Sequence, residues 1–194
     1  MKKKIVKNKI KVIFLDRDGV INRYPGNKNY VTSLAGFKLL RGTLTAIKKL
    51  TLSGYKIYVI SNQAGVAKGL YSKDTLKNIT DHLLGQVRKT GGKIEKVLYC
   101  THLQKQSCGC RKPKDGLLRK ATKGKRLDLE ECYFIGDSLL DVKAGKSFGC
   151  KTVLVLTGRE KLKNSSQWDA APDFIAKTLL CATNHIIAGR YQRA

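Results

Sequence analysis

Apolar runs alternate with segments of helical spacing along most of this chain, and turn residues separate them. The runs are rich in β-branched and aromatic residues, which is typical of buried strands, and the segments between them carry apolar residues three and four positions apart. Strands that alternate with helices indicate βαβ units, so we predict an α/β fold with a doubly wound, mostly parallel sheet. The predicted strands span 10–15, 55–60, 94–99, 132–135, 152–156 and a short edge strand at 172–175; the predicted helices span 43–52, 72–89, 115–122, a segment that ends near 148, and 176–187.

The length of 194 residues suits one α/β domain and is short for two. We therefore expect a basic N-terminal segment at 1–9, followed by a single domain at 10–190 without a large inserted cap domain. No apolar run is long enough to cross a membrane. The lysine-rich start is a poor signal peptide because its apolar stretch is short and interrupted by lysine. These features lead us to expect a cytoplasmic protein.

The formal net charge of +25 is unusually high. Positive charge of this size favours polyanions in general, so a nucleic-acid partner is one interpretation. The lysines are spread over the whole chain, aromatic residues make up only 7%, and no arginine-rich segment interleaved with aromatic residues is present. The composition therefore favours a solvated, lysine-rich surface and a small anionic substrate over a nucleic-acid partner.

Two carboxylates follow the first predicted strand directly, at Asp16 and Asp18, and Gly19 comes next. In an open α/β sheet, ligands bind outside the carboxyl ends of the strands. Two acids this close repel each other unless a cation or a shared proton relieves them, and oxygen ligands suit Mg²⁺. The alternative is a turn at the end of a strand, in which Asp and Gly serve the backbone.

Polar side chains also follow other predicted strands. Ser61 and Asn62 end the second strand, and Asp137 follows the fourth. A hydroxyl and backbone amides suit the oxygens of a phosphate, and Asp137 completes an oxygen-ligand set with Asp16 and Asp18. Arg111 and Lys112 supply cations to the same edge of the sheet. Each signal alone is also typical of turns and caps, but together they predict one site.

The six cysteines form two groups in the sequence. Cys132, Cys150 and Cys181 lie beside apolar runs and are interpreted as small core residues. The ligand-type residues of the other group follow the third strand within eleven positions, at Cys100, His102, Cys108 and Cys110. Three thiolates and one imidazole make a closed tetrahedral set for Zn²⁺, which is typical of a structural zinc. The alternative is a loop with incidental or redox-active cysteines.

These motifs together resemble the haloacid dehalogenase (HAD) superfamily of phosphatases over roughly residues 10 to 160. Within it, residues 61–69 and the cysteine loop at 100–110 look like the group that acts on D-glycero-D-manno-heptose 1,7-bisphosphate, a group closely similar to the histidinol-phosphate phosphatases. The motifs that carry the resemblance are Asp16-Arg17-Asp18-Gly19-Val20, Ser61-Asn62-Gln63, Arg111-Lys112-Pro113-Lys114 and Gly136-Asp137-Ser138 with Asp141.

The resemblance implies a Mg²⁺-dependent phosphomonoesterase that removes the 7-phosphate of the heptose bisphosphate. Asp16 would attack phosphorus and form an aspartyl-phosphate, while Asp18 would protonate the leaving oxygen and then activate water. The implied Mg²⁺ ligands are Asp16, the backbone carbonyl of Asp18, and Asp137. Asp141 would orient the ligands of this metal site without binding the ion itself.

The resemblance also implies the contacts to substrate. Ser61 and Asn62 would bind phosphate oxygens, and Lys112 would neutralise charge on the phosphoryl group and on Asp16. Arg111 and Lys68 would contact the rest of the substrate. Histidinol phosphate and a polynucleotide 3′-phosphate remain alternative substrates, and a non-catalytic nucleic-acid-binding protein on this scaffold is an alternative of another class.

Overall fold

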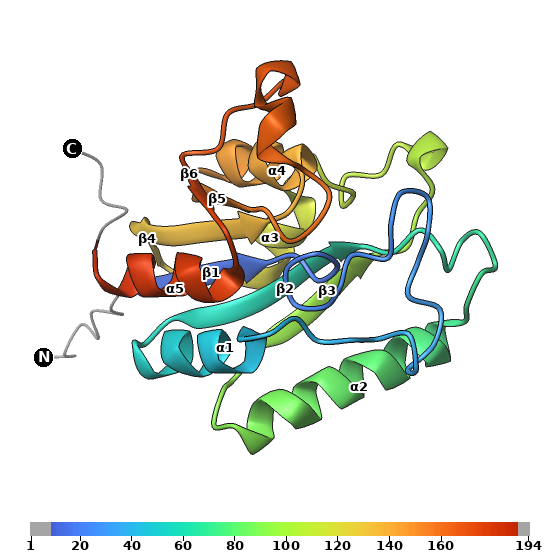
Figure 1. Cartoon of the computed structure of the whole chain (residues 1–194), viewed down its shortest axis with the longest axis horizontal. Helices are drawn as coiled ribbons and strands as arrows, with labels where there is room; N and C mark the ends of the chain where they lie inside the picture. Colours follow the sequence, from blue (N-terminus) through green and yellow to red (C-terminus); the bar gives the residue numbers. More distant parts are fainter. Residues whose placement is uncertain (1–8, 190–194) are drawn as a thin grey trace, which may run out of the picture.

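The computed structural model describes residues 9–189, so residues 1–8 of the predicted basic segment and residue 190 lie outside the described part. Its centre is a six-stranded sheet in the order β3-β2-β1-β4-β5-β6 (Figure 1). Every neighbouring pair of strands is parallel, so the sheet is wholly rather than mostly parallel. The strands are β1 (Ile10–Leu15), β2 (Lys56–Asn62), β3 (Lys96–Cys100), β4 (Leu127–Gly136), β5 (Lys151–Val155) and β6 (Phe174–Ala176).

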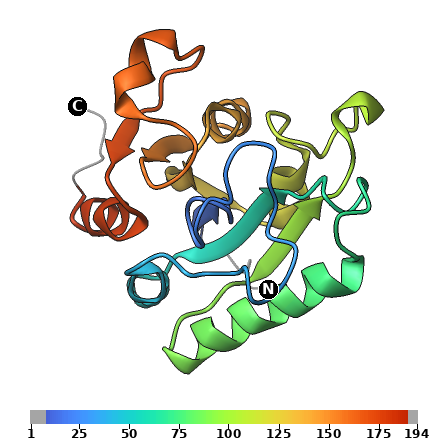
Figure 2. The ribbon, with the colours of Figure 1, turned by 45° about the vertical axis from the view of Figure 1, so that its right-hand side comes forward.

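Helices cover both faces of the sheet, as Figures 1 and 2 show from two directions. Side chains alternate between the faces along each strand, so Ile13 and Leu15 of β1 join one apolar core while Val12 and Phe14 join the other. The first core is closed by α1 (Thr43–Leu52), α2 (Lys73–Lys89) and α5 (Leu179–Ile187), and the second by α3 (Gly116–Thr122) and α4 (Leu139–Phe148). This arrangement confirms the predicted doubly wound α/β fold.

Local signals set most of the helix ends. The predicted cap Ser72 accepts a hydrogen bond from the backbone N–H of Thr75 at the start of α2. Gly54 follows the end of α1 with a φ of +83°, a backbone conformation that glycine adopts at no steric cost. None of the helices in residues 9–189 combines the length and apolar character needed to cross a membrane.

The main difference from the predicted elements is the start of β4, which lies at Leu127 and not at residue 132. Residues 127–131 are mostly polar and partly exposed, so the hydrophobic pattern does not identify them as strand. The backbone still pairs there, because Ile10 of β1 lies opposite Leu127, with a register shift before Val12. The last elements also begin later than predicted, with β6 at Phe174 and α5 at Leu179.

A prediction follows from the packing of α1. Ile47 is fully buried in the first core, so Ile47→Ala is expected to lower the free energy of unfolding by about 3 kcal/mol. Leu52 on the same helix is 74% exposed, and Leu52→Ala should change stability by less than about 0.5 kcal/mol. Urea denaturation of both variants measures the difference, and equal small effects would contradict the placement of α1 on the sheet.

Candidate active site

The predicted polar residues meet at the carboxyl edge of the sheet, where the strand order reverses between β1 and β4. Asp16 follows β1, Ser61 is the next-to-last residue of β2, and Asp137 follows β4. Parallel strands bring these ends to one edge, which is the usual position of a ligand site in this topology. One cleft is lined by Asp16, Asp18, Ser61, Asn62, Arg111, Lys112 and Asp137, together with residues of the segment 24–30 and the start of α4.

The ammonium group of Lys112 is the hub of the buried part of the site. Its Nζ donates to Asp16 Oδ1 at 2.7 Å, to Asp141 Oδ1 at 2.5 Å and to the backbone carbonyl of Ile60 at 3.0 Å. Burial alone would lower the pKa of Lys112, but the carboxylates of Asp141 and Asp16 outweigh it and raise this pKa above its ordinary value. Lys112 is therefore a fixed cation at the base of the cleft.

Negative charge exceeds positive charge in this cluster. Asp16, Asp137 and Asp141 are all buried, and one oxygen from each lies within 4.8 Å of the others. Burial raises the pKa of Asp16 to about 6, with further increases from Asp141 and Asp18 and an opposing effect of Lys112. Burial and then Asp16 and Asp141 likewise raise the pKa of Asp137 well above its ordinary value. Three crowded carboxylate groups of this kind fit a hard divalent cation such as Mg²⁺.

Glycines allow the backbone to pack tightly around Asp137. A β-carbon on Gly19 would lie 2.3 Å from Asp137 Oδ2, and one on Gly158 would lie 2.0 Å from the same atom. The N–H of Arg159 donates to Asp137 Oδ2 at 2.8 Å and fixes the carboxylate further. Gly19 therefore leaves space for the carboxylate of Asp137, which follows the neighbouring strand β4.

Asp141 holds Lys112 from the first turn of α4. Its second oxygen accepts from the backbone N–H of Ser138 at 3.1 Å and from the Ser138 hydroxyl at 2.6 Å. This is a reciprocal cap at the start of the helix, and it orients the oxygen that faces Lys112. Asp141 thus supports the site indirectly, by fixing the ammonium group of Lys112.

Asp18 has a different environment from Asp16, although only one residue separates them. Its carboxylate accepts from the buried guanidinium of Arg17, from Asn22 Nδ2 at 2.8 Å and from Gln63 Nε2 at 2.8 Å. Gln63 Nε2 also donates to Ser61 Oγ at 3.2 Å. The second acid is thus held by Arg17, Asn22 and Gln63, a set of partners different from that of Asp16.

Asn62 lines the cleft, but its side chain is already engaged. Its Nδ2 donates to the backbone carbonyl of Lys112 at 3.1 Å, and its Oδ1 accepts from the Lys112 N–H at 3.1 Å. The amide therefore positions Lys112, and the phosphate contact predicted for Asn62 stays a prediction.

Lys68 is not among the residues that line the cleft. Its ammonium lies 5.3 Å from the centre of the Tyr30 ring, and Tyr30 does line the cleft. The substrate contact predicted for Lys68 stays a prediction.

The cleft has walls that the sequence motifs did not indicate. One wall is formed by the segment with Tyr24, Lys28 and Tyr30. Arg159, which follows β5, also lines the cleft. The available signal was length, because residues 16–42 connect β1 to α1 without a helix or strand, and long connections in compact domains are commonly functional. Nothing in the sequence around Arg159 distinguishes it from the many other basic residues.

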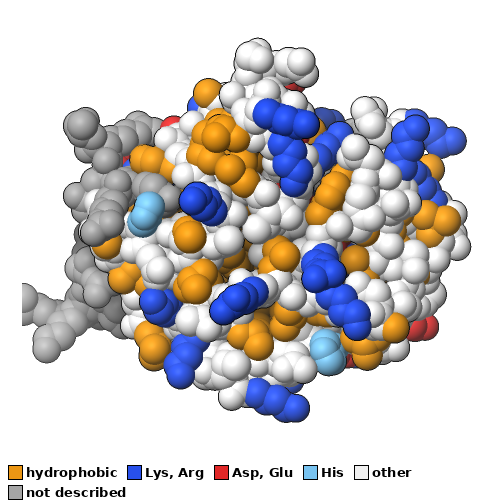
Figure 3. Space-filling model, in the orientation of Figure 1, with side chains coloured by type: hydrophobic (Ala, Val, Ile, Leu, Met, Phe, Trp, Pro, Cys, Tyr) orange, Lys and Arg blue, Asp and Glu red, His pale blue; other side chains and the backbone are white. Residues whose placement is uncertain are grey.

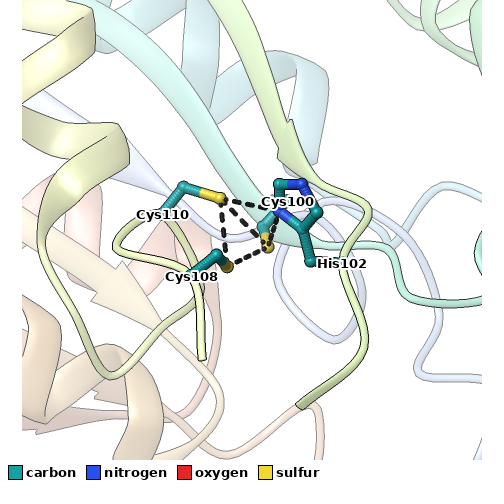
Figure 4. A group of neighbouring side chains, drawn as sticks. All are labelled: Cys100, His102, Cys108 and Cys110. Carbon is teal, nitrogen blue, oxygen red and sulfur yellow. Dashed lines mark hydrogen bonds between the residues drawn. The ribbon is translucent and has the colours of Figure 1, made fainter. Parts of the chain in front are cut away.

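The residues predicted to bind zinc converge at the end of β3, as Figure 4 shows. The three sulfurs lie 3.3 to 3.6 Å apart, and His102 Nδ1 lies 3.2 Å from Cys110 Sγ and 3.7 Å from Cys100 Sγ. Ligands in a tetrahedron around Zn²⁺ are roughly 3.3–3.8 Å apart for bonds of about 2.0–2.3 Å. Arg111 and Lys112 follow Cys110 directly, so this loop connects the cysteine cluster to the cleft.

Curated relatives match most of the chain. It is 37% identical over 150 residues to D-glycero-beta-D-manno-heptose-1,7-bisphosphate 7-phosphatase of Pseudomonas putida, with 77% of this chain and 85% of that one covered. It is also 37% identical over 153 residues to the alpha-anomer enzyme of Campylobacter jejuni, with 79% and 86% covered. The chain belongs to the heptose-bisphosphate phosphatase family of the HAD superfamily.

Solved structures support the same membership of this HAD family. D,D-heptose 1,7-bisphosphate phosphatase from B. bronchiseptica, in complex with magnesium and phosphate, superposes with a TM-score of 0.85 at 31% identity over 93% of this chain and 99% of that one. Residues 109–182 match the HAD-hydrolase-like family. The predicted resemblance to the HAD superfamily and to its heptose-bisphosphate group is thereby confirmed.

The buried ion pairs of Lys112 with Asp16 and Asp141 are expected to stabilise this HAD phosphatase. Lys112→Met is expected to lower the free energy of unfolding by about 3 kcal/mol in Mg²⁺-free buffer, because Asp16 and Asp141 would lose their buried counter-ion. Urea denaturation measures the change. Lys146→Met, at an exposed position of α4, is the matched control and should stay within about 0.5 kcal/mol of the wild type. A normal denaturation midpoint for Lys112→Met would show that the cluster is not held by this charge.

Proposed function

We propose that this protein is a Mg²⁺-dependent phosphomonoesterase that removes the 7-phosphate of D-glycero-D-manno-heptose 1,7-bisphosphate. The observation that carries the proposal is the convergence of Asp16, Asp18, Lys112 and Asp137 on one cleft in a chain whose relatives are named for this reaction. The relatives are named for different anomers, and the proposal concerns the 7-phosphate that both names share.

In this proposal the two acids have separate tasks. A carboxylate oxygen of Asp16 attacks phosphorus, the bond to the sugar oxygen breaks, and Asp18 gives its proton to that oxygen. Water then attacks the aspartyl-phosphate, Asp18 takes a proton from this water, and inorganic phosphate leaves. The different surroundings of the acids support this division, because Asp16 accepts from Lys112 whereas Asp18 accepts from two amides and from Arg17.

Mg²⁺ would be held by Asp16, Asp137 and the backbone carbonyl of Asp18. It would reduce the electrostatic repulsion between the anionic nucleophile and the anionic phosphate. The crowding of Asp16 and Asp137 supports their part in this assignment, whereas Asp141, the third member of the crowded group, bonds to Lys112. Lys112 neutralises further charge at Asp16, and Ser61 offers its hydroxyl to a phosphate oxygen.

The rim of the cleft favours a substrate with a second anionic group. Lys28, Arg111 and Arg159 line it, and none of them forms an ion pair with an acid in residues 9–189. Basic side chains are dispersed over the face of the molecule that Figure 3 presents, and acidic ones are scarce there. An anionic sugar would thus approach a positive surface, and a cytoplasmic phosphosugar is the proposed partner.

Zn²⁺ is proposed as a structural ion bound by Cys100, His102, Cys108 and Cys110. Four soft ligands leave no open position for chemistry. The first residue of α3, Gly116, packs so closely on this loop that a β-carbon there would lie 2.2 Å from the Gly109 carbonyl oxygen. The ion would fix the loop that delivers Arg111 and Lys112 to the cleft.

A substrate panel tests the proposed reaction. Phosphate release from heptose 1,7-bisphosphate is expected to exceed release from histidinol phosphate and from a 3′-phosphorylated oligonucleotide by at least about tenfold in kcat/KM, and Asp16→Asn should lose nearly all of it. Asp169→Asn, at an exposed acid outside the cluster, is the control and should retain activity. Full activity of Asp16→Asn would refute the mechanism, and preference for another member of the panel would replace the substrate. Tight, salt-dependent DNA binding without hydrolysis would indicate a binding protein.

Removal of zinc tests the role of the cysteine loop. Cys110→Ser is expected to lower bound zinc from about one ion per chain and to lower kcat/KM at saturating Mg²⁺, because Arg111 and Lys112 would lose their fixed position. Zinc content by elemental analysis and turnover are measured on the same samples. Cys181→Ser, outside the cluster, should change neither. Loss of zinc with unchanged turnover would show that the ion does not support the cleft.

A further inference from the structure

Gln63 is a fully buried polar residue that connects two functional side chains from different strands. Its Nε2 donates to Asp18 Oδ2 at 2.8 Å and to Ser61 Oγ at 3.2 Å. Asp18 follows β1 and Ser61 belongs to β2, so one amide group fixes the relative position of the proposed general acid and the proposed phosphate-binding hydroxyl. The function proposed above gives Gln63 no role.

The amide of Gln63 can act in this way in only one of its two orientations. Its oxygen, Oε1, accepts from the hydroxyl of Tyr71 and from Arg17 Nη2, the latter at 3.2 Å. If the amide were turned over, its oxygen would face the carboxylate of Asp18, and its NH₂ group would face the donors of Arg17 and Tyr71. The donors on Oε1 therefore determine that Nε2 points to Asp18.

Tyr71 reaches this position from the segment just before α2, and the chain leaves space for its ring. A β-carbon on Gly65 would lie 2.3 Å from Cε1 of Tyr71, so any larger residue at 65 would displace the ring. Tyr71 is only 7% exposed, and burial raises the pKa of its hydroxyl above the ordinary value, which keeps it a neutral donor.

We propose that Tyr71 and Gln63 are positioning residues that orient the carboxyl group of Asp18 for proton transfer to the leaving sugar oxygen. The proposal rests on the role of Asp18 in the proposed function. It extends the site beyond the cleft-lining residues, because neither Gln63 nor Tyr71 lines the cleft. Substrate enters on one side of Asp18, and the Tyr71–Gln63 pair supports it from the other.

The leaving group provides a readout that a merely structural role would not change. A sugar alkoxide needs a proton as it leaves, whereas p-nitrophenolate leaves without one. The constant kcat/KM covers the steps up to departure of the leaving group and excludes hydrolysis of the aspartyl-phosphate. A defect in Asp18 orientation thus lowers kcat/KM for an alkyl phosphate more than kcat/KM for p-nitrophenyl phosphate.

The experiment compares the purified, metal-loaded full chain and its variants on p-nitrophenyl phosphate and on the panel member with an alkyl leaving group that the wild type hydrolyses fastest. Tyr71→Phe removes only the hydroxyl that orients Gln63. Gln63→Met keeps the volume and removes all four hydrogen bonds of the amide group. Asp18→Asn is the reference for loss of the acid itself. Tyr55→Phe is the matched control. Tyr55 is about as buried as Tyr71, lies directly before the first residue of β2, and its hydroxyl donates to Glu131.

The expected loss in kcat/KM on the alkyl phosphate is about tenfold for Tyr71→Phe, about thirtyfold for Gln63→Met and at least about a hundredfold for Asp18→Asn, with losses on p-nitrophenyl phosphate at least about fivefold smaller in each case. Tyr55→Phe should show no such difference. Equal losses on both substrates for Tyr71→Phe and Gln63→Met, beside a leaving-group-dependent loss for Asp18→Asn, would overturn the positioning role and leave the proposed function intact. Equal losses for Asp18→Asn as well would show that Asp18 is not the acid, and the positioning role would fail with it.

Discussion

The structure of this site depends on one ammonium group among buried carboxylates. Lys112 joins Asp16 after β1 to Asp141 on α4, and its third hydrogen bond reaches the backbone of β2. Further hydrogen bonds hold these groups in place. The cap of α4 holds Asp141, and the amide of Asn62 holds the backbone of Lys112. Because one buried cation does not balance Asp16, Asp137 and Asp141, this cluster retains an excess of negative charge that a divalent ion is suited to relieve. The same imbalance that would destabilise an empty site thus prepares it for a metal cation.

The second functional constraint lies outside the sheet. Lys112 comes from a loop, so its position relative to Asp16 depends on how that loop is anchored. The cysteine and histidine side chains draw the loop together immediately before Arg111, and the start of α3 packs against it immediately after Lys114. In the proposed function, an ion bound by this ligand set would hold the loop in place without taking part in the reaction.

The sequence predicted those parts of the site that short motifs encode. Asp16, Asp18, Ser61 and Asp137 could be placed at one edge because each directly follows or ends an apolar run, and parallel strands bring such ends together. The exposed start of β4 escaped prediction because its residues are polar, and a sheet can extend beyond its buried part. The cleft wall at 24–30, Arg159, and the contact between Gln63 and Tyr71 escaped for another reason. They depend on where long connections place a side chain, and hydrophobic periodicity carries no information about that.

The contrast between Asp16 and Asp18 shows how one strand end can supply two kinds of carboxylate. The isolated bridge between Asp18 and Asn22 and the hydrogen bond from the N–H of Gly19 to the Asn22 carbonyl bend the chain directly after β1. This bend separates the two acids, so that Asp16 faces Lys112 and Asp137 while Asp18 faces Arg17, Asn22 and Gln63. A nucleophile needs a neighbouring cation that lowers repulsion from phosphate, and a proton shuttle needs a fixed orientation near the leaving oxygen. In the proposed function the two neighbourhoods meet these needs separately, since Lys112 and Asp137 lie at Asp16 whereas Arg17, Asn22 and Gln63 hold Asp18. The division of labour proposed for the two acids therefore depends on the different partners of each carboxylate.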